Sequence, residues 1–386
     1  MAEATTYTGT VSGVMHRDTY QELTSKQKIS NIIQFACFNK NPFTKVIGVE
    51  AFGVDAMTDL NKFGVKAPTG RIVRYDTGGI CLTGSVFQES GTNAHVGRLG
   101  SFNPELNEGG AEWAYSWFRL IHAEYIPDVD VQDNSSDRYI DIKAQKLESA
   151  KRKYVQDFNY CLLGHTSAPT GGPDGLYCSL PHLIDTNTGT AHTVGGIEKS
   201  VTNAAGTIEY WQNGSKAITS LGGGGEMDRP LTLRRSLMDA KNDQMKLAEA
   251  SDDYLLLASQ GAWQYYDRLM YADSIQGNKG VMGTLAKYDA AGINHKAFDG
   301  SPMVWDPAVT VPHDATASTE SIYGIHIPSF FLSLRTEENF KVTGWESPRE
   351  HDTLRTEVLQ IRTRYTPGVT AMRPHFVAYN MPACPD

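Results

Sequence analysis

Four consecutive glycines, Gly222–Gly225, form the segment that comes closest to a phosphate-binding loop. A loop of the GxxxxGK[ST] type needs a lysine against the phosphates and a hydroxyl against Mg²⁺. Here Glu226 and Asp228 follow the glycines, their negative charges would repel an anion, and no lysine stands at the required position. The sequence therefore predicts a flexible hinge before a helix and no nucleotide cofactor.

Two histidines and a carboxylate, His182, Asp185 and His192, come closest to a metal-ligand pattern. They lie in a Gly/Thr-rich segment, and their spacing matches no strong zinc signature. Cys178 precedes His182 by one helical turn, but no nearby acid could orient that histidine for nucleophilic catalysis. This segment predicts no metal site and no catalytic residue.

Paired carboxylates and aromatic residues offer two further possibilities. Asp299 and Asp306 flank the segment GSPMVW and could act as paired acid and base, as in a glycosidase, but Asp-Gly and Asp-Pro are also ordinary turn dipeptides. Trp113, Tyr115 and Trp117 alternate along one strand and could stack on sugars or bases, although such a face more commonly packs internally. Structural roles are favoured for both groups.

The composition is that of a folded protein with two or three compact units. Of the 386 residues, 40% are apolar and 20% are charged, which suits a large core. The 44 acidic residues outnumber the 35 Lys and Arg, which argues against a protein that mainly grips nucleic acid. The cysteines form no CxxC pair, and no apolar run reaches the ~20 residues of a membrane span.

Apolar periodicity predicts helices over residues 20–38, 231–245 and 260–274, the last capped by Ser259, and a long helix after residues 134–136. In the long helix, Ala150, Tyr154 and Phe158 recur every fourth residue, and Gly164 is a natural stop. At 1.5 Å per residue this helix would be about 40 Å long and would act as a structural spine.

Extended segments are predicted at residues 71–77, 79–88, 111–120, 253–258, 301–307 and 322–327. The first three predict one long β-hairpin over residues 70–125, with its tip between Gln88 and Gly110. The final segment, residues 356–381, predicts two strands around the turn Thr366-Pro367-Gly368. Residues 1–20 are polar and predict an arm without a core of its own.

Several short motifs follow one another in an order known from one family. The hairpin ends in AEWAYSWFRLIHAEYI, the long helix comes next, and then HTVGGI, YWQN and GSPMVWDP, which start at residues 192, 210 and 300. Together they resemble the major capsid proteins of tailed double-stranded DNA bacteriophages, in which the second of these segments is WWRN-like. The likeness covers most of the chain from about Gly70 onward.

This resemblance implies an α+β, Hong Kong-97-type capsid fold. Its parts would be an N-terminal arm (1–69), an extended hairpin or E-loop (70–125), a peripheral domain (126–193 and 341–386) and an axial domain (194–340). It further implies a non-enzymatic protein that assembles in the cytoplasm of a bacterial host into the pentamers and hexamers of an icosahedral shell. The virion shell encloses DNA without sequence-specific contacts, and scaffolding, portal and decoration proteins are further expected partners.

A two-stranded hairpin of this length buries little surface and leaves unpaired strand edges. We therefore expect the hairpin and the polar arm to lie on neighbouring copies, with Trp113, Tyr115, Trp117 and Arg98 as candidate assembly residues. Because the hairpin begins near residue 70, we also expect no large N-terminal segment to be removed during maturation.

Two alternatives stay open at this point. An encapsulin-type compartment has the same implied fold and would enclose cargo proteins in place of a genome. An enzyme or carbohydrate-binding protein whose motifs are not recognised is the other. Electron microscopy separates the containers from the enzyme, and nucleic acid in native particles separates the virus from the compartment.

Overall fold

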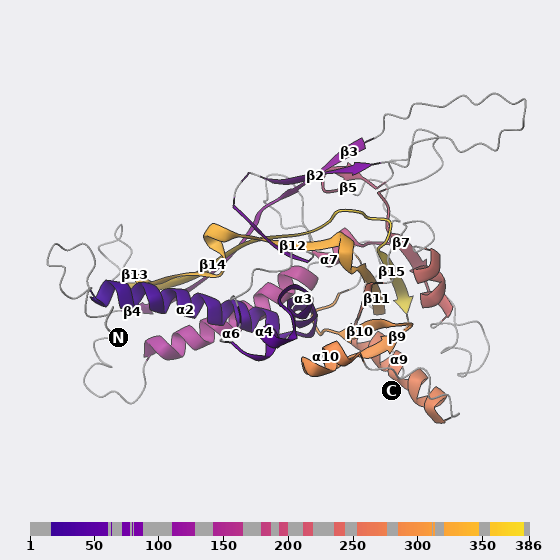
Figure 1. Cartoon of the computed structure of the whole chain (residues 1–386), viewed down its shortest axis with the longest axis horizontal. Helices are drawn as coiled ribbons and strands as arrows, with labels where there is room; N and C mark the ends of the chain where they lie inside the picture. Colours follow the sequence, from indigo (N-terminus) through magenta and orange to yellow (C-terminus); the bar gives the residue numbers. More distant parts are fainter. Residues whose placement is uncertain are drawn as a thin grey trace, which may run out of the picture. The chain divides into compact units, whose positions relative to one another are not determined.

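The computed structural model describes residues 17–60, 63, 72–77, 79, 81–87, 110–127, 142–164, 179–186, 193–199, 211–218, 235–243, 253–275, 285–310, 312, 320–346 and 356–381 (Figure 1). Contacts divide the chain into two compact units. The first comprises Met1–Gly78, Phe118–Asn159 and Ser333–Tyr365, and the second comprises Gly79–Trp117, Tyr160–Leu332 and Thr366–Asp386. Among the described residues, no helix has the length and apolarity needed to cross a membrane.

The first unit begins with the helices α2 (Arg17–Lys40), α3 (Pro42–Phe52) and α4 (Val54–Thr58). The helix predicted over residues 20–38 is therefore confirmed. Pro42 stands at the start of α3, where its missing N–H has no helical partner to lose. The ring of Phe38 packs edge-on against those of Phe52 and Phe340. The range predicted as an arm, 1–69, thus contributes helices to a core, while its first sixteen residues lie outside the described chain.

The long helix α6 (Ile142–Leu163) has the predicted apolar periodicity and ends directly before Gly164. Its side chains Ala150, Tyr154 and Phe158 are buried one turn apart. Within the first unit, Tyr154 and Phe158 each pack against Phe340, with ring centroids 6.2 and 5.5 Å apart. The cap candidates at residues 134–136 lie outside the described part of the chain.

A five-stranded sheet has the order β1 (Val73–Asp76), β12 (Phe330–Arg335), β14 (Thr356–Val369) and β13 (Lys341–Glu346), with β4 (Phe118–Pro127) also paired to β14. β4 and β14 run antiparallel from Phe118 opposite Tyr365 to Pro127 opposite Thr356. Along β14, Leu359 and Ile361 are buried, whereas Gln360 and Arg362 are partly exposed. This alternation is expected of a sheet that is covered on one face.

A six-stranded sheet in the second unit has the order β7 (Gly214–Ala217), β15 (Phe376–Met381), β11 (Glu320–His326), β8 (Tyr254–Ala258), β10 (Ser301–Trp305) and β9 (Lys296–Phe298). β8, β10 and β11 confirm the three predicted strands, and every residue of β8 is buried. Helix α9 (Gln260–Ile275) confirms a fourth prediction. The N–H of Gly261 in the first turn donates to the Glu320 carboxylate, and the Ser259 hydroxyl accepts the Ser321 N–H, so Glu320 takes the capping role expected of Ser259.

The described hairpin is shorter than the one predicted over residues 70–125. β2 (Cys81–Phe87) and β3 (Gly110–Ser116) pair antiparallel, with Cys81 opposite Ser116 and Phe87 opposite Gly110. The flanking strands β1 and β4 belong to the five-stranded sheet instead. The predicted tip between Gln88 and Gly110 lies outside the described residues. A second, much shorter hairpin joins β5 (Thr193–Val194) to β6 (Ile197–Glu198).

The prediction of a turn at Thr366-Pro367-Gly368 is wrong, because β14 continues through all three residues. The pairing of β14 with β4 ends at Tyr365, so no backbone N–H is needed at Pro367 for a hydrogen bond to β4. A Cβ on Gly368 would lie 2.5 Å from the ring of Phe331. Glycine therefore permits close packing at this position and makes no bend.

Short elements complete the described chain: α7 (Leu180–Leu183), α10 (Ala286–Ala290), and the 3₁₀ turns η1 (Ile327–Ser329) and η2 (Thr336–Glu338). Residues 235–243 are helical, which confirms the middle of the helix predicted over residues 231–245.

Candidate functional site

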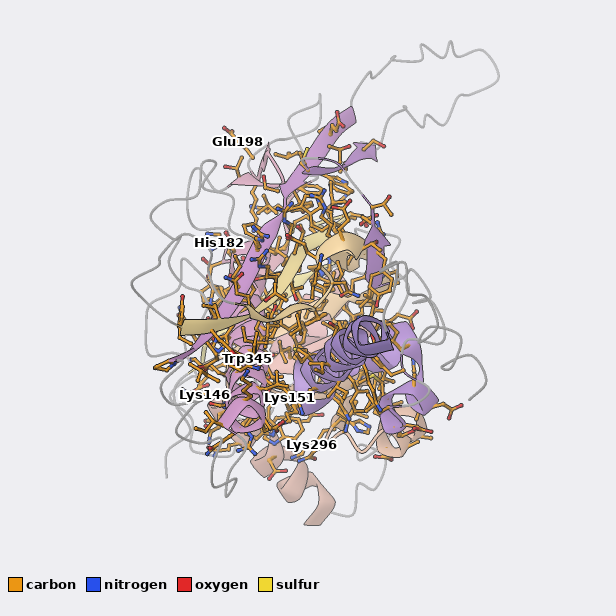
Figure 2. All side chains as sticks on the ribbon, turned by 90° about the vertical axis from the view of Figure 1, so that its left-hand side faces the viewer. Lys146, Lys151, His182, Glu198, Lys296 and Trp345 are labelled. Carbon is orange, nitrogen blue, oxygen red and sulfur yellow. The ribbon has the colours of Figure 1, made fainter. Side chains whose placement is uncertain are left out.

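The residues singled out for chemistry are only partly described. Gly222–Gly225, Cys178, His192 and Arg98 lie outside the described residues, so the hinge prediction stays a prediction. Among the residues that the structure describes, no group of three or more His, Cys, Asp or Glu side chains could hold a metal ion. His182 is buried in the short helix α7 (Figure 2).

Asp185 has a structural partner in place of a metal. Its carboxylate is fully buried, and Oδ1 lies 2.5 Å from Nζ of Lys199, which is itself 5% exposed at its side chain. Removing one partner of a buried ion pair lowers the stability of a fold by several kcal/mol. The pair therefore holds the segment after α7 next to the end of β6. The carboxylate of Asp185 is thus held in an ion pair with Lys199.

Asp299 and Asp306 both shape turns, the role favoured from their sequence. Asp299 and Gly300 have φ values of 46° and 76° and connect β9 to β10, where Phe298 lies opposite Ser301. The carboxylate of Asp306 accepts the Ala308 N–H at 2.9 Å, an Asx-type turn. Asp299 therefore belongs to the β9–β10 turn, and Asp306 stabilises a separate turn after β10.

The predicted aromatic face of β3 packs inside the second unit. Trp113 and Tyr115 are 6% and 1% exposed, and their ring centroids lie 5.6 and 5.7 Å from that of Phe331. The Tyr115 hydroxyl donates to the carbonyl of Val369 at 3.1 Å. Trp117, the next residue of the alternation, is only half-buried. Trp113 and Tyr115 could contact another copy directly only if this packing opened. Their role in assembly therefore stays a prediction.

The turn of the β5–β6 hairpin rests on the same aromatic side chains. Gly195 and Gly196 have φ values of 61° and 79°, as a tight two-residue turn requires. The carbonyl of Gly195 accepts the N–H of Ala114 at 2.7 Å. A Cβ on Gly195 would come within 3.0 Å of the Tyr115 ring. The HTVGGI motif therefore docks a glycine turn onto β3.

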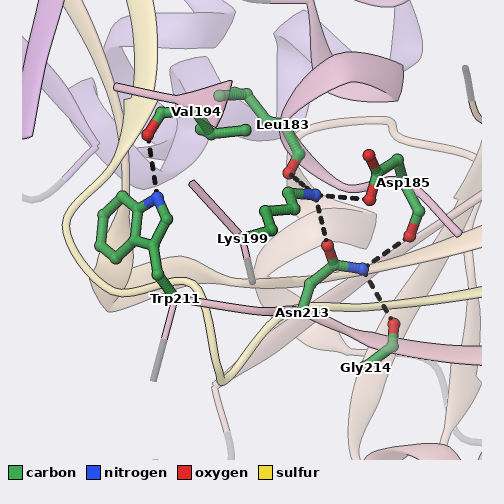
Figure 3. A network of polar contacts seen from close by, with 7 residues as sticks. All are labelled: Leu183, Asp185, Val194, Lys199, Trp211, Asn213 and Gly214. Carbon is green, nitrogen blue, oxygen red and sulfur yellow. Dashed lines mark hydrogen bonds and ion pairs between the residues drawn. The ribbon is translucent and has the colours of Figure 1, made fainter. Parts of the chain in front are cut away.

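A buried polar network lies beside this turn (Figure 3). Lys199 Nζ donates to the Leu183 carbonyl at 3.1 Å, to Asp185 at 2.5 Å and to Asn213 Oδ1 at 2.7 Å. The Trp211 indole N–H donates to the carbonyl of Val194 at 2.8 Å. The YWQN motif thus supplies Trp211 to the glycine turn and Asn213 to the lysine. Sequence reasoning missed Lys199 and Asn213, because their partners come from three separate segments.

A second buried cluster was also missed. Ser329 Oγ lies 2.8 Å from Nδ1 of His326 and 2.9 Å from Nε2 of His375. Burial, with His326 and Lys199 nearby, lowers the pKa of His375 to about 3, so this imidazole is neutral near pH 7. A serine between two imidazoles resembles an activated nucleophile, but all three residues are buried.

Ion pairs join α6 to strands of the first unit. Lys146, labelled in Figure 2, lies 3.8 Å from Glu124 of β4, and Lys143 lies 2.6 Å from Glu357 of β14. These side chains are partly exposed, and such pairs are typically worth ~0.2–1 kcal/mol each. They orient the helix on the strands more than they stabilise it.

The face of β4 that carries Arg119 also exposes two large apolar side chains. Ile121 and Tyr125 are 47% and 60% exposed and project on the same side of the strand, because residues two and four apart share a face. On α6, Ala144 of the predicted apolar stripe is likewise exposed. These described residues leave apolar surface uncovered on a single chain.

Comparison with known proteins gives a result for the fold. No family model and no curated protein matches the sequence. The cyanophage A-1(L) capsid asymmetric unit matches with a TM-score of 0.56 and 13% identity, covering 87% of this chain and 92% of that chain. The capsids of cyanophage P-SCSP1u and Myoviridae phage XM1 match with TM-scores of 0.49 and 0.46 at 11% and 7% identity. They cover 84% and 81% of this chain and 95% and 90% of theirs.

The A-1(L) match spans nearly the full length of both chains, and it agrees with the order of the sequence motifs. Trp211 of YWQN donates to Val194 of HTVGGI in the second unit, and GSPMVWDP supplies its strand β10. This chain has the α+β, Hong Kong-97-type fold of tailed-phage capsid proteins.

Proposed function

We propose that the chain is the major capsid protein of a tailed double-stranded DNA phage and assembles into the icosahedral shell of the virion. The observation that carries this proposal is the fold match to the A-1(L) capsid over 87% of the chain. A reaction on an external substrate forms no part of the proposal. The net charge of −9 suits a container that encloses DNA without binding it tightly.

Finer assignments follow from the same proposal. The hairpin β2–β3 corresponds to the described part of the extended E-loop expected over residues 70–125, and α6 corresponds to the spine helix of a peripheral domain. The six-stranded sheet corresponds to the axial domain (194–340), which surrounds the symmetry axes of pentamers and hexamers, except for β15, which comes from the range 341–386 assigned to the peripheral domain. The supporting observation for the E-loop is that β2 and β3 form a separate two-stranded sheet. One face of this sheet packs on its own chain through Trp113 and Tyr115, so a role on a neighbouring subunit falls to its opposite face.

The partner in this proposal is a second copy of the same chain. Ile121 and Tyr125 supply apolar surface for it on β4. Head-to-tail contacts of this kind close into rings and shells when the geometry permits. Scaffolding, portal and decoration proteins complete the set of proposed partners.

Electron microscopy of the purified, expressed chain tests the proposal. We expect closed shells, or rings of pentamers and hexamers, and DNA inside particles isolated from a phage lysate. The double variant Ile121→Ser/Tyr125→Ser should stay folded with an unchanged melting temperature but no longer assemble. A wild-type chain that stays monomeric at high concentration, with and without a crowding polymer, would refute the shell. Native particles that hold protein cargo and no DNA would refute the viral role.

A further inference from the structure

The imidazole of His375 lies where the pairing of two interior strands of the six-stranded sheet, β11 and β15, ends (Figure 1). The two strands run antiparallel, and their register ends with Gly324 opposite Phe376. The next contact between them is made by a side chain, because the backbone N–H of His326 donates to Nδ1 of the His375 ring at 3.2 Å. An imidazole nitrogen thus takes the place of the carbonyl that a paired strand would supply.

This contact determines which nitrogen of the His375 ring carries the proton. Because Nδ1 accepts a hydrogen bond, the neutral ring is protonated at Nε2, and Nε2 donates to Oγ of Ser329 at 2.9 Å. The Ser329 hydroxyl can donate to Nδ1 of His326 at 2.8 Å or to the carbonyl of the same residue at 3.3 Å. These three residues, which we call the histidine cluster, are therefore satisfied with both imidazoles neutral.

The histidine cluster also connects to two further segments of the second unit. The carbonyl of His375 accepts the N–H of Gly214, the first residue of β7, at 2.8 Å. Ser329 ends the turn η1, and its carbonyl accepts the N–H of Thr370 at 2.8 Å. The position of His375 therefore affects β7, β11 and η1 together.

A proton on His326 leaves the histidine cluster intact. Its protonated Nδ1 would donate to Ser329 Oγ, and the serine hydroxyl would turn to the His326 carbonyl. The Asp253 carboxylate favours this charge, but burial outweighs it and lowers the pKa of His326. Tyr254, whose ring centroid lies 5.5 Å from that of His326, is uncharged near pH 7. Titration of His326 alone therefore breaks no contact between β11 and β15.

A proton on Nδ1 of His375 breaks the cluster. Nδ1 would then be a donor that faces the backbone N–H of His326, so the hydrogen bond between them is lost. Burial and the nearby His326 and Lys199 oppose this charge, whereas the Ala371 carbonyl favours it. Lys199 is itself paired with Asp185. The pKa of His375 is lowered to about 3 in this site, so the ring takes up a proton far more readily once it has left the site.

We propose that protonation of His375 opens the histidine cluster and separates the start of β15 from β11, while the rest of the six-stranded sheet stays paired. The other contacts of this strand pair are made by backbone groups, which do not titrate. The device belongs to one chain, so it holds whether or not that chain forms a shell. A histidine that only filled space would give no local opening with acid.

Hydrogen exchange of backbone amides in the unassembled wild-type subunit tests the proposal. The probe is the N–H of His326, and its protection is compared at pH 7 and at about pH 4.5 after correction for the intrinsic exchange rate. Opening exposes a ring whose pKa returns to 6.5, so this protection should fall roughly a hundredfold between the two pH values. Ile322 is the internal control, because it lies between Ala378 of β15 and Ala258 of β8. Its N–H should stay at least about tenfold better protected than that of His326 at the lower pH.

Two variants assign the effect to one ring. His375→Gln keeps a side-chain acceptor that does not titrate, so it should remove the dependence of the His326 N–H on pH. The matched control His122→Gln changes a histidine of β4 and should keep that dependence. Unchanged protection of the His326 N–H in the wild-type subunit would overturn the proposal. Equal protection of His326 and Ile322 at the lower pH would also overturn it, because the sheet would then open only as a whole. A hundredfold fall that persists in His375→Gln would overturn the role of His375.

Discussion

Replacing Trp113 by Ala is the sharpest test of the packing described for β3. The indole is 6% exposed, and its ring centroids lie 5.3 Å from Tyr115 and 5.6 Å from Phe331. It also covers Gly84 on β2, where a Cβ would come within 2.2 Å of the indole. Because glycine has no side chain to move into the space, the cavity left by Trp113→Ala cannot collapse easily. Large-to-small changes of this kind cost ~3–5 kcal/mol, and we expect the upper half of that range.

The assay is urea unfolding of unassembled subunits, followed by far-ultraviolet circular dichroism so that loss of a fluorophore does not matter. Two controls accompany the variant. Trp113→Phe keeps an aromatic ring and should recover part of the lost stability. Glu112→Ala changes the exposed neighbour on the opposite side of β3 and should alter stability by no more than ~0.5 kcal/mol. A loss below ~1 kcal/mol for Trp113→Ala, or an equal loss for Glu112→Ala, would refute the packing argument.

Three further predictions follow from other contacts. The pKa of His375 is lowered from 6.5 to about 3 in the folded chain, so as pH falls the unfolded chain takes up the proton first. The free energy of unfolding should therefore fall between pH 6.5 and pH 3, by at most ~5 kcal/mol for this group, and a His375→Gln variant should lose that part of the pH dependence. Gly324→Ala would place a Cβ 2.2 Å from the Phe376 ring and should cost ~1–3 kcal/mol, so an unchanged melting temperature would contradict the close approach of β11 and β15. Glu338→Gln leaves Arg119 and Arg364 without their shared carboxylate and should cost ~1 kcal/mol at low salt and less at high salt; a salt-independent loss would show that packing dominates.

The sequence predicted those elements whose signal is local and repeated. Ala150, Tyr154 and Phe158 recur at helical spacing, and the helix α6 carries them on its buried side. The run from Tyr254 to Ala258 is continuously apolar, and β8 lies buried between β10 and β11. In both cases the apolar residues are spaced so that they fall on the buried part of the element, so their pattern predicts both the element and its burial.

Local signals failed where tertiary packing changes their meaning. Pro367-Gly368 has the composition of a turn, but the strand continues because Gly368 makes room for Phe331. Lys199, Asp185 and Asn213 belong to different segments, and no spacing in the sequence marks their meeting. The same holds for Ser329 and its two histidines. Such clusters depend on how separate turns and loops are brought together, which periodicity does not encode.

The aromatic residues of β3 and the apolar residues of β4 show why residues that pack inside one subunit must be distinguished from residues that contact a second copy. A period-two pattern identifies an apolar face but not what covers it. Trp113 and Tyr115 are covered by Phe331 and the Gly195 turn of their own chain, so their loss should lower the stability of the isolated subunit. Ile121 and Tyr125 stay exposed on one chain, so their replacement should leave that stability unchanged and act only on assembly. A subunit that is equally stable and fails to assemble is therefore the outcome that only an interface residue can produce.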